Sequence, residues 1–317
     1  MRFSIEYGII EPEVNRMEVV KVTPRGYCKG VVRAIQIAKE CAMKYPDVPI
    51  TVLGMLVHNR YVMEALKLYH IQMIDDPNKT RVELLDDISE GIVIFTAHGI
   101  APSVFAKAKE KGLIIIDATC PDVLKTQEIV QAHLSKGYEI LYVGKAHHPE
   151  AEAVCAISNH IHLIESSDHI PLHIQNPVFV TNQTTMSIFD LKRLFDQIKV
   201  LYPNAVFCEE ICNATRIRQE AVANAANEGV DVLFVVGDIT SNNSNRLAQI
   251  ALEQGIKRVY LIDSVQDIQD EQLLNCQRVA VTAGASTPTY LTNQVISYLN
   301  NYATQKQKPE IVISKIL

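Results

Sequence analysis

The stretches that decide the fold are PRGYCKG at residues 24–30, DATCP at 117–121 and EEICNAT at 209–215. Each contains one cysteine, and Cys28, Cys120 and Cys212 are 92 residues apart in both intervals. Each cysteine also precedes a segment with a helical pattern. We therefore expect three similar α/β modules, each presenting one cysteine near its start. Three modules around a common centre would bring the three cysteines together.

Three cysteines at a common centre predict a particular kind of metal site. A structural zinc ion takes four ligands, so three thiolates do not complete it. Three thiolates suit an iron–sulfur cluster in which one iron stays open for chemistry. The competing interpretation is coincidence, since free cysteine is among the most buried residue types. The remaining cysteines have no ligand-like context and are interpreted as structural: Cys41, Cys155, Cys208 and Cys276.

Length and composition exclude several classes of protein. The 317 residues are 48% hydrophobic and 21% charged, which predicts a folded globular protein of two or three domains. A net charge of −6 without a basic stripe gives no reason to expect a nucleic-acid partner. We expect no membrane segment and no secretory signal, because no apolar run approaches the roughly 20 residues that span a bilayer. Seven cysteines argue against a disulfide framework and favour a reducing cytoplasm.

Short, apolar, β-branched runs alternate with amphipathic runs along the chain. Apolar strands separated by helices predict parallel sheets covered on both faces, so the expected class is α/β. Strands are expected at residues 18–22, 50–53, 92–95, 113–116, 139–143, 178–181, 232–236, 258–262 and 279–281. Helical patterns include residues 31–45, 62–69, 121–136, 187–201, 215–227 and 244–253. The expected division is an N-terminal extension (1–18), three modules (19–119, 120–211 and 212–303) and a C-terminal tail (304–317).

Polar residues recur just after the expected strands in all three modules. In open parallel sheets, ligands bind beyond the carboxyl ends of the strands. A lone histidine is usually structural, but His58 and His98 stand at equivalent strand ends, which favours contacts to an anion. The Ser/Asn cluster at residues 241–245 opens a helix, and such an N-terminus can bind phosphate. Serine and asparagine are also ordinary N-caps, and the same two interpretations apply to Ser286.

Glu150 lies two residues after His148, at the start of an expected helix. A carboxylate there is stabilised by the helix dipole, which would be a purely structural role. The functional interpretation is a proton donor that faces the central site, with the Thr184 hydroxyl as its partner. These residues alone do not decide between the two. The chain has no phosphate-binding GxxxxGK[ST] loop and no GxGxxG, so no nucleotide is indicated.

An ordered set of motifs from about residue 20 to 290 resembles the LytB family of 4-hydroxy-3-methylbut-2-enyl diphosphate reductases. Besides the cysteine stretches, it comprises VHNR (57–60), TAHG (96–99), HPE (148–150), QTT (183–185), RQEA (218–221), SNRL (244–247) and TAGAS (282–286). The resemblance implies a cytoplasmic monomer, trefoil-like around a central 4Fe–4S cluster. It also implies reductive dehydroxylation of the substrate to isopentenyl and dimethylallyl diphosphate, the last step of the non-mevalonate isoprenoid pathway. The implied electron donor is a small flavodoxin or ferredoxin.

The resemblance also assigns roles to residues. It implies that Cys28, Cys120 and Cys212 bind three irons, while the fourth iron binds the substrate hydroxyl. It implies that Glu150 supplies protons and Thr184 orients that hydroxyl. The implied diphosphate contacts are His58, His98, His148, Ser241, Asn242, Asn243 and Ser286.

Two positions depart from the family pattern. Many relatives have serine where this chain has Asn242, and we expect its side-chain donor and its backbone N–H to preserve the anion site. His147 stands where a small or polar residue is common. The register of the motif favours His148 as the histidine that faces the ligand.

Two other functions compete with this one. A non-catalytic iron–sulfur sensor would have no use for phosphate-binding motifs, and tight cluster binding without affinity for allylic diphosphates would favour it. A zinc-dependent phosphohydrolase would need a compact metal motif such as HExxH, which this chain lacks. Metal analysis that finds zinc without sulfide would favour the phosphohydrolase.

Overall fold

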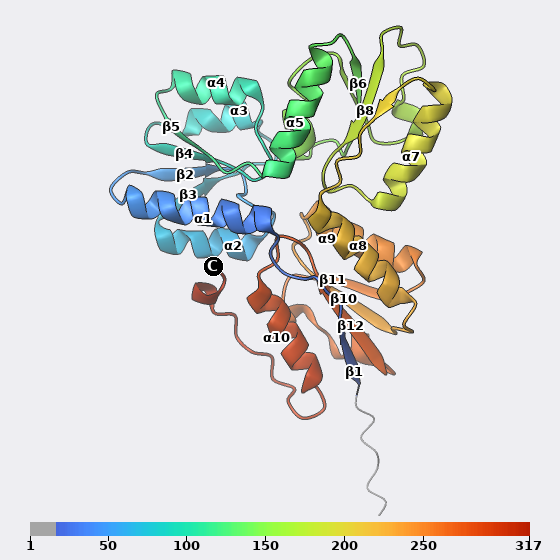
Figure 1. Ribbon diagram of the computed structural model, residues 1–317. Helices are drawn as coiled ribbons and strands as arrows, with labels where there is room; N and C mark the ends of the chain where they lie inside the picture. The colour runs from blue at the N-terminus through green and yellow to red at the C-terminus, as the bar shows by residue number, and fades with distance from the viewer. Residues whose placement is uncertain (1–16) are drawn as a thin grey trace, which may run out of the picture.

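The chain folds into three units, each built on a four-stranded sheet with helices between successive strands (Figure 1). This computed structural model describes residues 17–317. The strand pairings within each sheet are parallel. The predicted α/β class with three modules is therefore confirmed. The predicted extension 1–18 lies, except for its last two residues, outside the described residues.

The first sheet has the strand order β3-β2-β4-β5. Its strands are β2 (Ile50–Leu53), β3 (Ile71–Ile74), β4 (Ile92–Phe95) and β5 (Ile114–Asp117). Its helices are α1 (Lys29–Lys44), α2 (Arg60–Leu66), η1 (Lys67–Tyr69), α3 (Arg81–Leu84), η2 (Leu85–Asp87) and α4 (Pro102–Glu110). Helix α1 buries Val31, Ala34, Ile35 and Ala38, a spacing that places apolar side chains along one face.

The second sheet has the order β7-β6-β8-β9. Its strands are β6 (Glu139–Val143), β7 (Ile161–Ile164), β8 (Val178–Asn182) and β9 (Val206–Phe207). Its helices are α5 (Pro121–Leu134), α6 (Pro149–Cys155), η3 (Ser167–His169) and α7 (Ile188–Leu201). The central strands β6 and β8 are buried almost throughout, because helices cover both faces of the sheet.

The third sheet has the order β1-β12-β10-β11. Its strands are β1 (Glu18–Lys21), β10 (Val232–Val236), β11 (Arg258–Ile262) and β12 (Arg278–Ala283). Its helices are α8 (Asn213–Ala226), α9 (Asn242–Glu253), η4 (Val265–Asp267), η5 (Asp270–Leu273), α10 (Thr289–Asn300) and η6 (Ile313–Lys315).

Strand β1 differs from the expected division, which counted it with the first module. It pairs with β12, and Val20 is opposite Ala280. The reason is packing: Val22, just after β1, is buried in the core of the third module. We keep the three-module division as a proposal, with β1 assigned to the third module.

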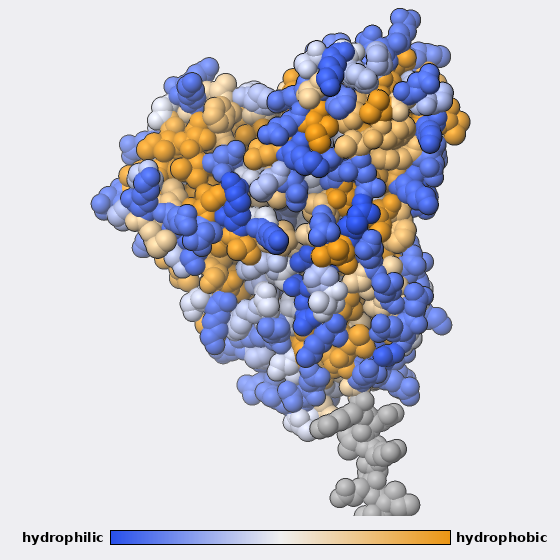
Figure 2. Space-filling view, in the orientation of Figure 1, coloured by the Kyte–Doolittle hydropathy of each residue, from blue (hydrophilic) through white to orange (hydrophobic). Residues whose placement is uncertain are grey.

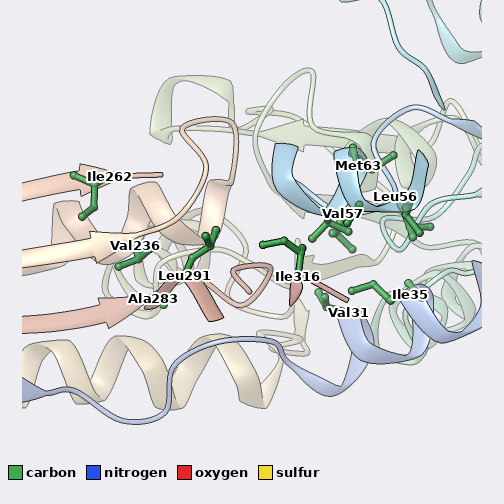
Figure 3. Close-up of a cluster of buried hydrophobic side chains, with 14 of the residues drawn as sticks. Val31, Ile35, Leu56, Val57, Met63, Val236, Ile262, Ala283, Leu291 and Ile316 are labelled. Carbon is green, nitrogen blue, oxygen red and sulfur yellow. The ribbon is translucent and has the colours of Figure 1, made fainter. Parts of the chain in front are cut away.

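One hydrophobic cluster joins the first and third modules (Figure 3). It runs from Val31 of α1 and Val57 through Ile316 near the C-terminus to Leu291 of α10 and Val236 of β10. The second module packs into two clusters of its own residues. Among the residues described, Phe189 is the one hydrophobic side chain of the second module that packs against a cluster of another module. The first and third modules thus share a core that the second lacks.

The tail 304–317 packs against the rest of the protein. Ile316 is buried, and its carbonyl accepts a hydrogen bond of 2.9 Å from the Tyr27 hydroxyl. On the face shown in Figure 2, hydrophilic residues separate scattered hydrophobic patches. None of the helices in residues 17–317 has the length and apolar character needed to span a bilayer.

Candidate functional site

A pocket at the centre of the molecule is lined by residues of all three modules. It contains all twelve residues that the sequence suggested for the site: Cys28, His58, His98, Cys120, His148, Glu150, Thr184, Cys212, Ser241, Asn242, Asn243 and Ser286. Helices α1, α5 and α8 begin close to this centre (Figure 1). The structure therefore brings the candidates together, while their individual roles stay predictions.

Each of the three cysteines is the N-cap of a helix. Cys28 caps α1, Cys120 caps α5 and Cys212 caps α8. A Cβ atom on Gly30 would stand 2.6 Å from the Cys120 sulfur and 3.8 Å from the Cys28 sulfur, so Gly30 leaves room beside both. Burial raises the pKa of Cys120 to about 11 and also raises that of Cys212. These two are therefore thiols until a metal displaces their protons.

The donor set fits a cluster better than a single ion. Among residues 17–317, no three His, Cys, Asp or Glu side chains are placed to bind one metal ion. This does not suit the zinc site of a phosphohydrolase. A cluster binds one thiolate per iron, so its thiolates need not meet at one point. Three free, partly exposed cysteines around one pocket meet that requirement.

Arg218 connects two of the cysteine segments. Its guanidinium donates hydrogen bonds of 2.7 Å to the Gly26 carbonyl and 2.8 Å to the Ala214 carbonyl. Gly26 lies two residues before Cys28, and Ala214 lies two after Cys212. The sequence offered the RQEA motif but no role for this arginine, because its contacts depend on tertiary packing.

Three histidines form a tight group on one side of the pocket. The ring centroids of His58 and His98 are 4.2 Å apart, and His148 is 5.6 Å and 5.8 Å from them. Burial is the main cause that lowers the pKa of His58 to about 4 and that of His148 to about 3. It also lowers the pKa of His98 well below its usual range. All three imidazoles are neutral at pH 7.

Several polar atoms in the pocket have no partner. Both ring nitrogens of His58 and both side-chain polar atoms of Asn243 are buried without a hydrogen bond within the described residues. Leaving such groups unpaired is costly, so they indicate a polar ligand. Asn243 belongs to the first turn of α9, whose positive end favours an anion.

The remaining polar candidates lie beside Asn243. Ser241 is the N-cap of α9, and the Ser286 hydroxyl donates to the His58 carbonyl at 2.9 Å. The Asn242 amide nitrogen donates to the Thr185 carbonyl and hydroxyl at 3.0 and 3.1 Å. The side-chain donor expected of Asn242 is therefore engaged by Thr185. Its contact with a ligand stays a prediction, resting now on its backbone N–H.

Glu150 is fully buried and bound to Thr184. The Thr184 backbone N–H donates to Oε1 at 2.7 Å, and the Thr184 hydroxyl donates to Oε2 at 2.9 Å. The Tyr142 hydroxyl lies 3.4 Å from Oε1. Burial outweighs these hydrogen bonds and raises the pKa of Glu150 to about 7. A carboxyl group with that pKa can hold or release a proton near neutral pH.

His147 and His148 face different spaces. His148 lines the central pocket, and its Nδ1 accepts from the Glu150 backbone N–H at 3.2 Å. His147 has a left-handed backbone with φ of 60° and lines a separate groove. The structure thus places His148 at the pocket, as the register predicted.

We expect acid to destabilise the ligand-free protein through its three buried histidines. Their pKa values are lower in the folded state than the usual 6.5 of the unfolded chain, so the unfolded chain binds more protons as pH falls. Stability present above pH 6.5 is therefore lost below it, by about 2 kcal/mol per histidine at pH 5. Urea denaturation between pH 7 and pH 5 measures this loss. His98→Asn should give a shallower pH dependence, and an unchanged one would contradict the assignment.

Comparison with known proteins identifies the family of this chain. The LytB protein family model matches residues 19–300. A 4-hydroxy-3-methylbut-2-enyl diphosphate reductase of Anoxybacillus flavithermus is 47% identical over 311 residues, covering 95% of this chain and 98% of that protein. A reductase of the same name from Bacillus cytotoxicus is 48% identical over 310 residues, with 95% and 98% covered.

Two solved structures share the fold of this chain. The E-1-hydroxy-2-methyl-but-2-enyl-4-diphosphate reductase from Plasmodium falciparum superposes with a TM-score of 0.84 at 29% identity, covering 95% of this chain and 96% of that chain. A structure of (E)-4-hydroxy-3-methyl-but-2-enyl diphosphate reductase gives a TM-score of 0.62 at 30% identity, with 90% and 99% covered. The family match over most of the chain and the identity to these relatives lead to one conclusion: the chain belongs to the LytB family.

Proposed function

We propose that this protein is an iron–sulfur oxidoreductase that converts (E)-4-hydroxy-3-methylbut-2-enyl diphosphate into isopentenyl and dimethylallyl diphosphate, the last step of the non-mevalonate pathway. One observation carries the proposal: a single pocket unites three cysteines, three neutral histidines and a buried carboxyl group. Two electrons and two protons enter, the allylic C–O bond breaks, a C–H bond forms and the oxygen leaves as water.

Membership of the LytB family implies an iron–sulfur cluster. We propose that it is a 4Fe–4S cluster held by Cys28, Cys120 and Cys212, with one iron open. Such a cluster supplies a Lewis-acidic iron for the substrate hydroxyl and a route for electrons. Gly30 supports the assignment, because a side chain there would occupy the space beside two of the sulfurs.

The other pocket residues bind the substrate and move protons. The unpaired groups of His58 and Asn243 support a diphosphate site together with His98, His148, Ser241, Asn242 and Ser286. Glu150 holds a proton on its carboxyl group near neutral pH and delivers it toward the allylic carbon or the departing hydroxyl. Thr184, bound to both carboxyl oxygens, orients Glu150 and relays the proton through its hydroxyl.

The partners are those that the resemblance to the LytB family implies. The substrate is an allylic diphosphate, and the electron donor is a small flavodoxin or ferredoxin. We place the protein in the cytoplasm as a monomer without a nucleic-acid or membrane partner. A non-catalytic sensor is not favoured, since it has no use for the unpaired polar groups of an anion site.

Product analysis tests the function directly. Cluster-reconstituted protein is incubated without oxygen with the hydroxylated diphosphate and a reduced viologen. We expect both isopentenyl and dimethylallyl diphosphate. An intact cluster with substrate bound but no product would contradict the enzyme assignment, and an intact cluster without affinity for the diphosphate would favour the sensor.

A further inference from the structure

The central pocket would hold an anion of several negative charges without an arginine or lysine among the described residues that line it. Its three histidines are neutral in the ligand-free protein, and the carboxylate of Asp122 adds negative charge to the lining. Helix α9 contributes only a partial positive charge at its start. The arrangement therefore calls for a cation that lies outside the lining but close behind it.

Arg81 lies outside the lining of the central pocket, and its charge acts on all three histidines. It lines a groove between the first and second modules, which we call the outer groove, together with Gly99, Pro149 and Glu152. Gly99 directly follows His98 and Pro149 directly follows His148, so these loops separate the guanidinium from the central pocket. Its Nη1 donates to the Leu53 carbonyl at the end of β2, the strand that precedes His58.

Gly54 leaves room for the guanidinium of Arg81 because it has no side chain. A Cβ atom on Gly54 would stand 2.6 Å from Nη1 and 2.9 Å from Cζ of Arg81, so the arginine packs directly on the glycine backbone. Asp75 and Glu152 are the carboxylates that influence its pKa, yet neither lies within ion-pair distance in residues 17–317. Arg81 is therefore a partly buried cation without a close carboxylate partner among residues 17–317.

The charge of Arg81 reaches each histidine. It acts with burial to lower the pKa of His58, His98 and His148. Lys145 has this effect on His148 alone. Because Coulomb interactions weaken slowly in a buried environment, the same charge attracts an anion held by these imidazoles.

We propose that Arg81 is a positioning residue for the diphosphate, supplying from outside the pocket lining the fixed positive charge that this lining lacks. This inference rests on the proposed function of the site. It assigns Arg81 no contact with the substrate and no step in proton or electron transfer. Its removal should weaken anion binding much more than turnover.

The test measures binding of inorganic diphosphate to the anaerobic holoprotein by calorimetry. Arg81→Met keeps the length of the side chain and removes its charge, and we expect Kd to rise about tenfold or more. Arg81→Lys keeps the charge, and we expect Kd within about threefold of wild type. Lys79→Met is the matched control, because Lys79 is an exposed neighbour already paired with Asp87 at 2.7 Å, and its Kd should stay unchanged.

Two exposed carboxylates of the outer groove provide a test that does not depend on the folding of Arg81 variants. Asp75→Asn and Glu152→Gln remove negative charge near the guanidinium, so each should tighten diphosphate binding about twofold to threefold at low salt. With the allylic diphosphate as substrate, Arg81→Met should raise KM and leave kcat within about threefold.

The results separate this inference from the proposed function. Equal weakening by Arg81→Met and Arg81→Lys, wild-type binding by Arg81→Met, or unchanged binding by both carboxylate variants would overturn the role of Arg81. In each case wild-type turnover would still support the reductase. If wild-type holoprotein bound no diphosphate and formed no product, the proposed function itself would fail.

Discussion

Serine in place of Cys28, Cys120 or Cys212 is expected to remove most of the protein's iron and sulfide, and to lower reductase activity by more than about 100-fold. The reason is that each cysteine would hold a separate iron, so no other ligand takes over when one is lost. Loss of an outer-shell partner alone typically costs 10- to 100-fold, and loss of a direct ligand costs more. Iron and sulfide analysis after anaerobic reconstitution measures the first effect.

Two other cysteines are matched controls for this series. Cys208 is partly exposed like the three candidates and lies four residues before Cys212, but its sulfur donates to Glu210 at 3.2 Å. Cys41 is buried within α1. Cys208→Ser and Cys41→Ser should retain the wild-type iron content. The cluster assignment would be wrong if all five variants retained iron equally.

Glu150→Gln is expected to bind the allylic diphosphate with near-normal affinity while kcat falls by about 100- to 10,000-fold. Glutamine keeps the shape, since its oxygen can accept from the Thr184 backbone N–H while its amide group donates to the Thr184 hydroxyl. The proton is lost. Glu128→Gln, an exposed change on α5, is the control and should retain wild-type kcat.

The pH dependence provides a second measurement on the same variant. A carboxyl group with a pKa of about 7 carries its proton below pH 7, so wild-type kcat should fall as pH rises through 7. The residual activity of Glu150→Gln should not show that fall. Near-normal turnover in the variant, or the same pH profile in both proteins, would remove Glu150 from the mechanism.

The same substitution should raise the stability of the protein while it lowers its activity. The folded state raises the pKa of Glu150 above its unfolded value, so the free energy of unfolding declines as pH rises from about 4.5 through 7. Glutamine carries no such dependence. At pH 8 the variant should gain up to about 3 kcal/mol in unfolding free energy, as measured in urea.

The sequence predicted all the central strands, and of the edge strands it found β1, β5 and β11. Strands such as β6 and β10 are covered on both faces, so each appears as a continuous apolar run. The strands it missed, β3, β7 and β9, are edge strands with exposed or partly exposed residues, and β7 includes His162. Polar residues interrupt the apolar pattern of β3 and β7, and β9 has only two residues, so the pattern alone does not distinguish these three strands.

In the site, too, some residues can be identified from the local sequence pattern and others only from tertiary contacts. Cysteines, histidines and Glu150 lie at strand ends or helix starts, where the pattern of elements indicates function. Arg218 connects the cysteine segments from within a helix, and Tyr142 approaches Glu150 from within a strand, through contacts that depend on the folded chain. The RQEA motif contains Arg218 but gives it no role, and Tyr142 belongs to no motif. Only the folded structure identifies them.

The hydrophobic cluster shared by the first and third modules has a thermodynamic consequence. Opening of either module would expose this common core, so we expect their unfolding to be coupled. The second module has its own cores, and beyond Phe189 its ties to the third include the hydrogen bonds from Gln219 to Met186 and from Asn242 to Thr185. A ligand or cluster that bridges the central pocket therefore also connects the second module to the joined first and third modules. Part of its binding free energy then opposes the separate unfolding of the second module.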